Sequence, residues 1–394
     1  MKKDKVDQGV IKEYNKKKII NLLKKSNGMT KRNIAKRIGV SLPTVISNVN
    51  ELIREGIVEE AGLADSTGGR KPVVVRFLEN SKYSFGVDFL IDSIRIILTN
   101  LNSEIIEDIT FKLWKTTSLT DTMNEISFRV NEMMEANNIQ EENVLGIGFS
   151  LPGTVNEKQL ILEVAPNLGL EDIDFSQFKS LFGFPMFVEN EANAAAYAEL
   201  RLGVAREMSN LVYISIMKGV GTGIIIQSQL YKGNNKRAGE FGHMTIQPGG
   251  RKCICGKQGC WNAYVSENGL INAYNELTGY NIKTLAEFIQ CLKKGNKTAK
   301  AEWDKYIDYL AIGIQNILFS LDPHYIILGG SIANYEDIFL DSLRERVFKD
   351  INFFKPDDVK ILVSKLRESS SIIGASLLPL ESFFYIDDKI IYKI

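Results

Sequence analysis

The first fifty residues of the chain place apolar side chains at the three- and four-residue spacing of short amphipathic helices. One such helix is expected within residues 12–25, where the apolar positions fall between Ile19 and Leu23. A second is expected to begin after Thr30 and a third after Ser41, because a hydroxyl just before a helix accepts a hydrogen bond from a first-turn amide. Three short helices joined by tight turns are typical of a helix–turn–helix.

The third of these helices combines an apolar face with a polar one. Its expected buried face carries Val45, Ile46, Val49, Leu52 and Ile53. The opposite face offers short hydrogen-bonding groups and a proline that the first helical turn tolerates, at positions Pro43, Thr44, Ser47 and Asn48. Side chains of this kind can reach base edges in the major groove of DNA, so this is the expected recognition helix.

Two short strand patterns follow and flank a basic loop. Residues 57–60 and 73–76 are the expected strands, and the loop between them contains Gly-Gly-Arg-Lys-Pro at residues 68–72. Such a hairpin is the wing of a winged helix, and its tip can reach a minor groove or phosphates. A winged module that binds protein would show the same pattern. If the partner is DNA, the expected contacts are Thr30, Ser41, Pro43, Thr44, Ser47, Asn48, Arg70 and Lys71.

From residue 82 onward, buried strand patterns alternate with helical ones, and a second lobe is expected from about residue 211. The expected strands lie at residues 83–88, 93–99, 143–149, 186–188, 212–216 and 325–328. The first two predict a hairpin, and the fourth leads into an alanine-rich helix. This alternation is typical of an α/β protein, and 394 residues suffice for two or three domains.

The net charge of zero conceals an uneven distribution. Residues 1–76 hold 17 Lys and Arg against 8 Asp and Glu, a net of +9, so the remainder holds 31 against 40, a net of −9. A basic N-terminal segment on an acidic body suggests that this segment meets a polyanion. A basic segment that serves only solubility would look the same.

Three of the four cysteines and one of the two histidines fall within eighteen residues, as His243, Cys253, Cys255 and Cys260. One imidazole and three thiolates supply the four ligands of a tetrahedral zinc site, and a closed set of four indicates a structural ion. The alternative is a group of buried cysteines beside a chance histidine. Glu240 lies three residues before His243, and a carboxylate beside an oriented imidazole suits a polyol such as a sugar.

We also expect a cytoplasmic protein with no membrane partner. The sequence has no apolar run long enough to cross a bilayer, and its polar start has no secretory leader. Cys291 is left over once the zinc ligands are taken, which argues against a disulfide framework and fits a reducing compartment.

The string Gly-Glu-x-Gly-His, followed by Cys-x-Cys-Gly-x-x-Gly-Cys, resembles the zinc motif of the ROK family of repressors, open reading frames and sugar kinases. The resemblance covers essentially the whole chain. It implies a winged helix–turn–helix followed by an α/β, two-lobed sugar kinase/actin-like (ribonuclease H-like) fold with a sugar cleft between the lobes. The implied domains are the head at 1–78, lobe I at 79–196 with residues 370–394 returning to it, and lobe II at 197–369. The implied sugar ligands are Asn167, Asn190, Glu191, Glu240 and His243.

The chain departs from the kinases of this family at the positions that handle phosphate. Family kinases carry Asp-x-Gly-Gly-Thr after the first strand, where this chain has Asp88-Phe89-Leu90-Ile91-Asp92, and Lys218 interrupts a second glycine turn. Glu191 stands where the kinases have a catalytic Asp, and Asn262 stands where they have a sugar-binding Glu. We therefore expect no enzyme. The alternatives are a sugar kinase with a DNA-binding head and, for Glu191, an ordinary solvated residue.

Within the family, three strings resemble the xylose repressors of low-GC Gram-positive bacteria: residues 188–194, 242–246 and 259–261. This resemblance implies a homodimer, or a dimer of dimers, that binds a palindromic operator and is released from it by D-xylose. An activator would use the same parts.

Overall fold

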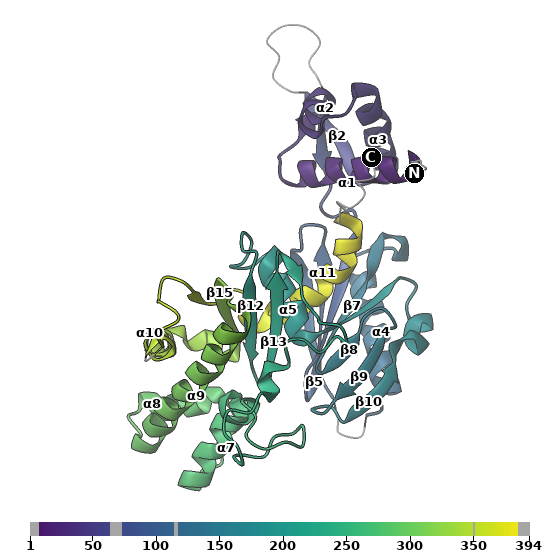
Figure 1. The fold of residues 1–394 in the computed structure, drawn as a ribbon. Helices are drawn as coiled ribbons and strands as arrows, with labels where there is room; N and C mark the ends of the chain where they lie inside the picture. Colours follow the sequence, from purple (N-terminus) through teal and green to yellow (C-terminus); the bar gives the residue numbers. More distant parts are fainter. Residues whose placement is uncertain (1–7, 64–72, 114–116, 350, 385–394) are drawn as a thin grey trace, which may run out of the picture.

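The chain folds into a small N-terminal head and a larger body of two lobes (Figure 1). The computed structural model describes residues 8–63, 73–113, 117–349 and 351–384. Within these ranges, no helix combines the length and apolar character needed to span a bilayer.

The head consists of three helices and a small antiparallel sheet in the order β1-β3-β2. Its elements are α1 (Gln8–Lys24), β1 (Met29–Thr30), α2 (Lys31–Ile38), α3 (Leu42–Arg54), β2 (Val58–Leu63) and β3 (Val73–Phe77). The predicted caps are confirmed: the Thr30 hydroxyl accepts from the Asn33 amide at 3.2 Å, and the Ser41 hydroxyl accepts from the Thr44 amide at 3.3 Å. The pairing of β2 with β3 confirms the two strands predicted for the wing.

Lobe I is built on a five-stranded mixed sheet in the order β11-β7-β4-β5-β6. Its strands are β4 (Tyr83–Phe89), β5 (Ser93–Asn100), β6 (Ile105–Lys112), β7 (Val144–Leu151) and β11 (Met186–Asn190). Helix α4 (Leu119–Ala136) buries its apolar side chains in the same core as this sheet. A second, antiparallel sheet consists of β8 (Thr154–Asn156), β9 (Ile161–Ala165) and β10 (Leu170–Asp174), with η1 (Glu141–Asn143) and η2 (Phe175–Leu181) as short 3₁₀ helices.

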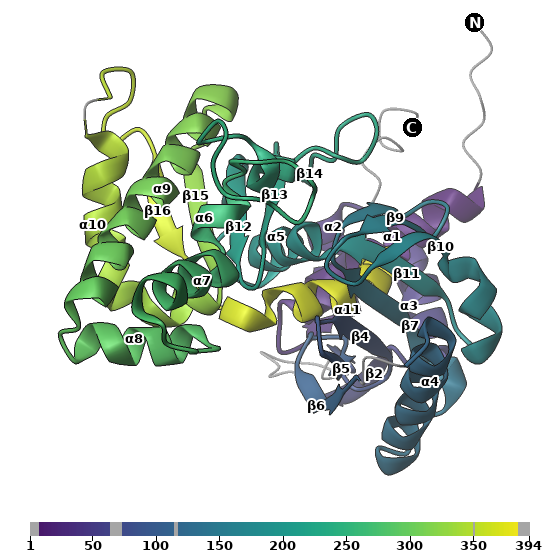
Figure 2. The ribbon, with the colours of Figure 1, turned by 90° about the horizontal axis from the view of Figure 1, so that it is seen from below.

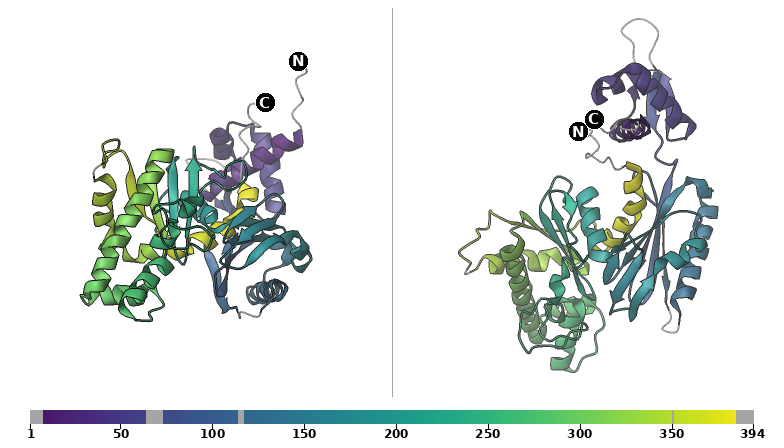
Figure 3. Two further views of the ribbon diagram at one scale, coloured as in Figure 1. Left: turned by 60° about the horizontal axis from the view of Figure 1, so that its bottom comes forward. Right: turned by 45° about the vertical axis from the view of Figure 1, so that its right-hand side comes forward.

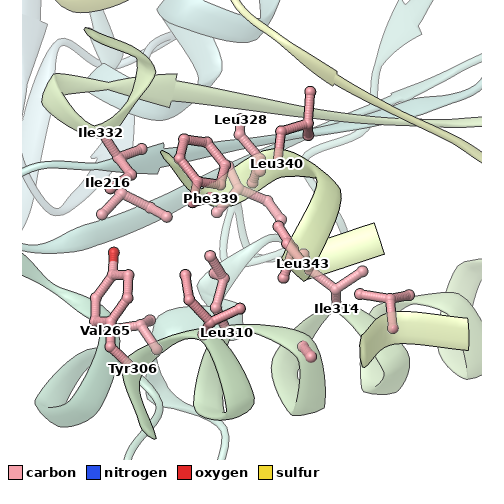
Figure 4. Close-up of a cluster of buried hydrophobic side chains, with 14 of the residues drawn as sticks. Ile216, Val265, Tyr306, Leu310, Ile314, Leu328, Ile332, Phe339, Leu340 and Leu343 are labelled. Atoms are coloured by element: carbon pink, nitrogen blue, oxygen red, sulfur yellow. The ribbon is translucent and has the colours of Figure 1, made fainter. Parts of the chain in front are cut away.

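Lobe II has its own five-stranded mixed sheet, in the order β14-β13-β12-β15-β16. Its strands are β12 (Leu211–Ile216), β13 (Val220–Ile226), β14 (Gln229–Leu230), β15 (Tyr325–Gly330) and β16 (Lys360–Val363). Its helices are η3 (Glu240–His243), α6 (Asn262–Val265), α7 (Glu267–Thr278), α8 (Leu285–Lys293), α9 (Lys297–Leu321), η4 (Ser331–Tyr335), α10 (Glu336–Phe348) and η5 (Arg367–Ser369). The main core of this lobe lies between the sheet and helices α9 and α10 (Figure 4). The side chains drawn there include Ile216, Val265, Tyr306, Leu310, Ile314, Leu328, Ile332, Phe339, Leu340 and Leu343.

The two lobes share one topology. When the strands of each sheet are numbered along the chain, both sheets have the spatial order 3-2-1-4-5. In each sheet the first strand pairs antiparallel with the second and parallel with the fourth. This repeat confirms the ribonuclease H-like, two-lobed fold class expected from the sequence.

Two helices, α5 (Glu191–Arg201) and α11 (Ser370–Phe384), lie between the two sheets (Figures 2 and 3). Helix α11 packs on the lobe I sheet so closely that a Cβ atom on Gly148 of β7 would lie 2.0 Å from the Ala375 carbonyl oxygen. The two helices touch just as closely, because a Cβ on Gly374 would lie 1.9 Å from the carbonyl oxygen of Ala194. Close backbone approach of this kind requires glycine.

The head lies against the C-terminal end of α11, and the hydrophobic core of the head continues into the body (Figure 1). Three side chains on one face of α1 donate to backbone carbonyls of the body: Lys17 to Ser382 at 2.9 Å, Asn21 to Phe384 at 3.0 Å and Lys24 to Leu101 at 2.6 Å. Two of these carbonyls belong to the last turn of α11, where helix carbonyls have no partner within the helix. A positive charge there also complements the helix dipole. The head is therefore fixed to the C-terminal end of α11, and the N-terminal end of the same helix lies beside the cleft between the two lobes.

Candidate functional site

Helix α3 presents Ser41, Pro43 and Ser47 to solvent, and Thr44 is half-buried. The sequence prediction was wrong for two neighbours. Ile46, placed on the buried face, is 39% exposed, whereas Asn48, placed on the exposed face, is 2% exposed. The helical period explains the burial of Asn48, because Asn48 lies three residues after Val45 and shares its buried face.

The burial of Asn48 also costs free energy, since its side-chain amide nitrogen has no hydrogen-bond partner among the residues that the structure describes. An unsatisfied buried donor costs about 1–3 kcal/mol. We predict that Asn48→Leu raises the thermal unfolding temperature of the protein and leaves its DNA affinity within a few-fold of wild type. Ser47→Ala, on the exposed face, should instead weaken DNA binding without changing stability. Loss of DNA binding in a stably folded Asn48→Leu protein would contradict this assignment.

The two wing residues predicted to contact DNA, Arg70 and Lys71, lie outside the described residues. Thr30 is half-buried, and its hydroxyl is used as the cap of α2. The exposed face of α3 is therefore the part of the predicted DNA surface that the structure presents directly.

The cleft between the lobes contains a pocket of about 720 Å³, including space open to solvent. The pocket brings together all five side chains predicted to bind a sugar, Asn167, Asn190, Glu191, Glu240 and His243, and Asn262 also lines it. They come from both lobes, with Glu191 at the start of α5 and Glu240 and His243 in η3. A ligand here would touch both lobes at once.

Two carboxylates face this pocket. Burial, together with the negative charges of Asp88 and Glu240, raises the pKa of Glu191 to about 7. Burial also raises the pKa of Glu240, against the opposing effect of His243. Asp88 is itself 4% exposed and accepts a hydrogen bond from the Ser371 hydroxyl at 2.6 Å. These carboxylates have lost water, so hydroxyl donors from a ligand would stabilise their charged forms.

Two amides are already engaged in building the pocket wall. The Asn190 side-chain oxygen caps α5, accepting from the amides of Ala192 and Asn193 at 2.9 and 3.0 Å, and its nitrogen donates to the Gly153 carbonyl at 2.8 Å. The Asn262 oxygen accepts from the Val220 amide at 2.7 Å. Both side chains hold the backbone of the pocket wall in place. Only the hydrogen-bonding capacity that these bonds leave unused is open to a ligand.

The side-chain donor atoms of His243, Cys253, Cys255 and Cys260 all lie within 4.8 Å of one another. His243 Nδ1 is 3.6 Å from Cys253 Sγ, and Cys255 Sγ is 3.7 Å from Cys260 Sγ. Zinc bonds of about 2.0–2.1 Å to nitrogen and 2.3 Å to sulfur imply tetrahedral edges of about 3.6–3.8 Å. The four residues therefore form a cluster whose donor set and spacing fit a bound metal ion.

Trp261 fixes this cluster to the core of lobe II. It follows Cys260 directly, is fully buried, and donates from Nε1 to the Tyr309 carbonyl of α9 at 2.9 Å. Its ring lies against Gly313 of α9, where a Cβ atom would come within 2.0 Å of it. The His/Cys cluster thus connects the pocket wall at His243 to helix α9, which spans 25 residues.

Charged side chains lie at the second glycine turn, which the sequence resemblance assigns to phosphate binding in the kinases of the family. Lys218 is 3.6 Å from the carboxylate of Glu267, which is 8% exposed. Glu267 also accepts a hydrogen bond from the Ser331 hydroxyl, just after Gly330 of β15. In the first turn, the Leu90 amide is bonded to the Ser93 carbonyl at 3.0 Å.

Some pocket residues escaped the sequence analysis. Lys236, Thr222 and Asn193 line the pocket, and Lys236 reaches it from the loop between β14 and η3. Asn193 lies inside the 188–194 string and Thr222 in the second glycine turn, but neither pattern gave them a role in the pocket. No motif marks Lys236, whose acidic partner Glu157 lies 79 residues earlier in the sequence.

A two-lobed α/β body with a polar cleft and a His/Cys cluster, joined to a winged head, defines a class of protein that similarity to known proteins identifies. The sequence profile of the ROK family matches residues 84–382, and that of a winged helix–turn–helix DNA-binding family matches residues 12–59. The chain belongs to the ROK family and carries a winged helix–turn–helix DNA-binding domain.

Particular relatives match along almost the whole chain. The xylose repressor of Bacillus spizizenii is 33% identical over 381 residues, which cover 96% of this chain and 98% of that protein. The xylose repressor of Bacillus subtilis is 32% identical with the same coverage. A crystal structure of a ROK family transcriptional regulator, a homologue of the Escherichia coli MLC protein, superposes with a TM-score of 0.81 at 21% identity, covering 98% of this chain and 99% of that one. Head and body therefore share one overall fold with that regulator.

Proposed function

We propose that the protein is a transcriptional repressor that D-xylose releases from a palindromic operator. The observation that carries this proposal is the arrangement of parts: a winged head is fixed to α11, and the opposite end of that helix bonds to Asp88 beside the cleft. The full-length similarity to two xylose repressors supports both the repressor role and the choice of sugar.

The binding chemistry follows from the pocket. Glu191 and Glu240 accept hydrogen bonds from sugar hydroxyls, and His243 supplies an oriented ring. His243 would hold a structural zinc ion through Nδ1 together with Cys253, Cys255 and Cys260, since Nδ1 is the ring atom on the cysteine side. The ion would fix the tautomer of His243 and leave Nε2 to the cleft.

The switch uses the position of the pocket between the lobes. A sugar that bonds to α5 and η3 favours one arrangement of the two lobes. Because α11 lies between the sheets of the two lobes, a change in the angle between the lobes moves this helix, which supports the head. Two heads in a dimer must match two half-sites about one DNA turn apart, and a small change in their spacing weakens binding. A hundredfold loss of DNA affinity requires about 2.7 kcal/mol, within the usual range of allosteric coupling.

We infer that the chain does not transfer phosphate. Glu267 places a buried carboxylate beside the turn where a nucleotide phosphate would lie, and Lys218, in that turn, pairs with this carboxylate at 3.6 Å. A Glu in place of Asp at position 191 moves the carboxylate by about 1.5 Å, more than the roughly 0.5 Å that catalytic placement tolerates.

Fluorescence anisotropy on DNA from upstream of the protein's own gene tests the proposal. At fixed salt, we expect a Kd of about 10⁻⁸ M or tighter and a loss of about 100-fold with saturating D-xylose, with unrelated DNA as the control. Binding that no sugar changes would reject the switch, and binding that xylose strengthens would indicate an activator. Sugar-dependent ATP consumption would support the kinase instead.

The raised pKa of Glu191 gives a prediction for pH. With a pKa of about 7, Glu191 is mostly protonated at pH 6 and mostly ionised at pH 8 in the sugar-free protein. The carboxylate is the stronger acceptor for sugar hydroxyls, so xylose affinity should rise by up to about tenfold between pH 6 and pH 8. Isothermal titration calorimetry at each pH measures this, and Glu191→Gln should remove most of the dependence. An affinity that falls over this range would show that the neutral acid binds the sugar.

A further inference from the structure

The loop between β14 and η3 carries cations that bond to carboxylates of lobe I. Lys236 is 2.9 Å from Glu157, and Arg237 is 3.0 Å from Glu163. Lys232, in the same loop, pairs with Glu157 at 3.3 Å and with Glu189. This loop of lobe II therefore spans the cleft, and it continues directly into Glu240.

Lys236 differs from Lys232 and Arg237 because it also lines the pocket. Its backbone has a φ of 59°, in the left-handed region that a lysine adopts only when its surroundings hold it there. Burial alone would raise the pKa of Glu157, but the hydrogen bond from Lys236 and the charge of Lys232 outweigh this effect, so the pKa of Glu157 is lowered. An ammonium group is thus held at the pocket wall.

The pocket needs donors of this kind. Glu191 and Glu240 are acceptors when ionised, and the amides of Asn190 and Asn262 are partly used in the wall. A sugar hydroxyl both donates and accepts, so a ligand held by two carboxylates still presents oxygen lone pairs. Lys236 has three N–H donors, and within the described part of the chain Glu157 accepts one of them.

We propose that Lys236 is a specificity-determining residue of the sugar site, donating from Nζ to one hydroxyl oxygen of the bound sugar while Glu157 holds it from lobe I. The sugar is then connected to lobe I through a residue of lobe II, and its affinity depends on how far the cleft has closed. This assignment rests on the proposed function.

Lys236→Met tests it, with Arg237→Met as the matched control. Both variants remove one cation and one ion pair between the lobes, but Arg237 is largely exposed and does not line the pocket. Calorimetry with D-xylose should show a loss of about 10- to 100-fold for Lys236→Met and less than about threefold for Arg237→Met. Lys236→Arg keeps a charged donor and should recover part of the loss. Thermal unfolding of each variant establishes that it is folded.

Xylose analogues that each lack one hydroxyl group show whether Lys236 contacts the sugar directly or only supports the structure of the pocket. One analogue should bind weakly to the wild type and lose nothing further in Lys236→Met, because the variant and the analogue remove the same hydrogen bond. Equal losses in Lys236→Met and Arg237→Met, full affinity in Lys236→Met, or additive losses for every analogue would each overturn the assignment. Wild-type protein that binds no xylose would contradict the proposed function itself, and that result is known before any variant is compared.

Discussion

Cys255→Ser is expected to abolish the sugar response. The serine hydroxyl is a poor zinc ligand, and with three ligands left the loop that carries His243 loses the ion that would fix it. His243 and Glu240 both line the pocket from η3, so xylose affinity should fall by more than about 100-fold. The heads are remote from this loop, and operator binding without sugar should persist.

Cys291→Ser is the matched control, because Cys291 is the one cysteine that the described cluster leaves out. Metal analysis should find about one zinc ion per chain in wild type and in Cys291→Ser, and much less in Cys255→Ser. Calorimetry with xylose then measures sugar binding, and anisotropy on operator DNA measures DNA binding, in each variant. A Cys255→Ser protein that keeps both its zinc and its sugar affinity would refute the structural role of the metal.

Glu240→Gln is expected to produce a repressor that binds its operator and does not release it. The substitution keeps the size of the side chain and removes the charge that strengthens hydrogen bonds from hydroxyl groups. Each such bond is worth about 1.5–3 kcal/mol, and a carboxylate that accepts two of them would cost about 100-fold or more in xylose affinity when replaced.

The measurement pairs calorimetry with anisotropy, and zinc content shows that the neighbouring cluster is intact. Glu276→Gln, an exposed residue of α7, controls for the loss of one negative charge from lobe II. Normal release of Glu240→Gln from DNA at ordinary xylose concentrations would show that Glu240 does not bind the sugar.

The head could be predicted from sequence because the features that define it are local. A hydroxyl before a helix and an apolar period of three or four residues act within one or two helical turns, and the structure shows the caps at Thr30 and Ser41. Asn48 was misplaced because its polarity was given more weight than its position, three residues after Val45.

The pocket was predicted less completely. Motifs predicted that Glu191, Glu240 and His243 bind the sugar. The position of Lys236, by contrast, depends on its bond to Glu157, 79 residues earlier in the chain. Pairings across such distances come from the meeting of two lobes, and a single sequence without an established fold does not show them. The same holds for Glu267, which pairs with Lys218 in the phosphate turn and accepts a hydrogen bond from Ser331, 64 residues later.

Helix α11 has a consequence for how the chain reaches its folded state. Its hydroxyl at Ser371 bonds to Asp88, 283 residues earlier, and the glycines of β4 and β7 lie against its backbone. During synthesis at about 5–20 residues per second, the first sheet would wait many seconds with one face uncovered. The head, although made first, would gain its support only when residues 370–384 emerge from the ribosome. Nascent chains that lack this segment are therefore expected to depend on chaperones and to bind DNA without control by sugar.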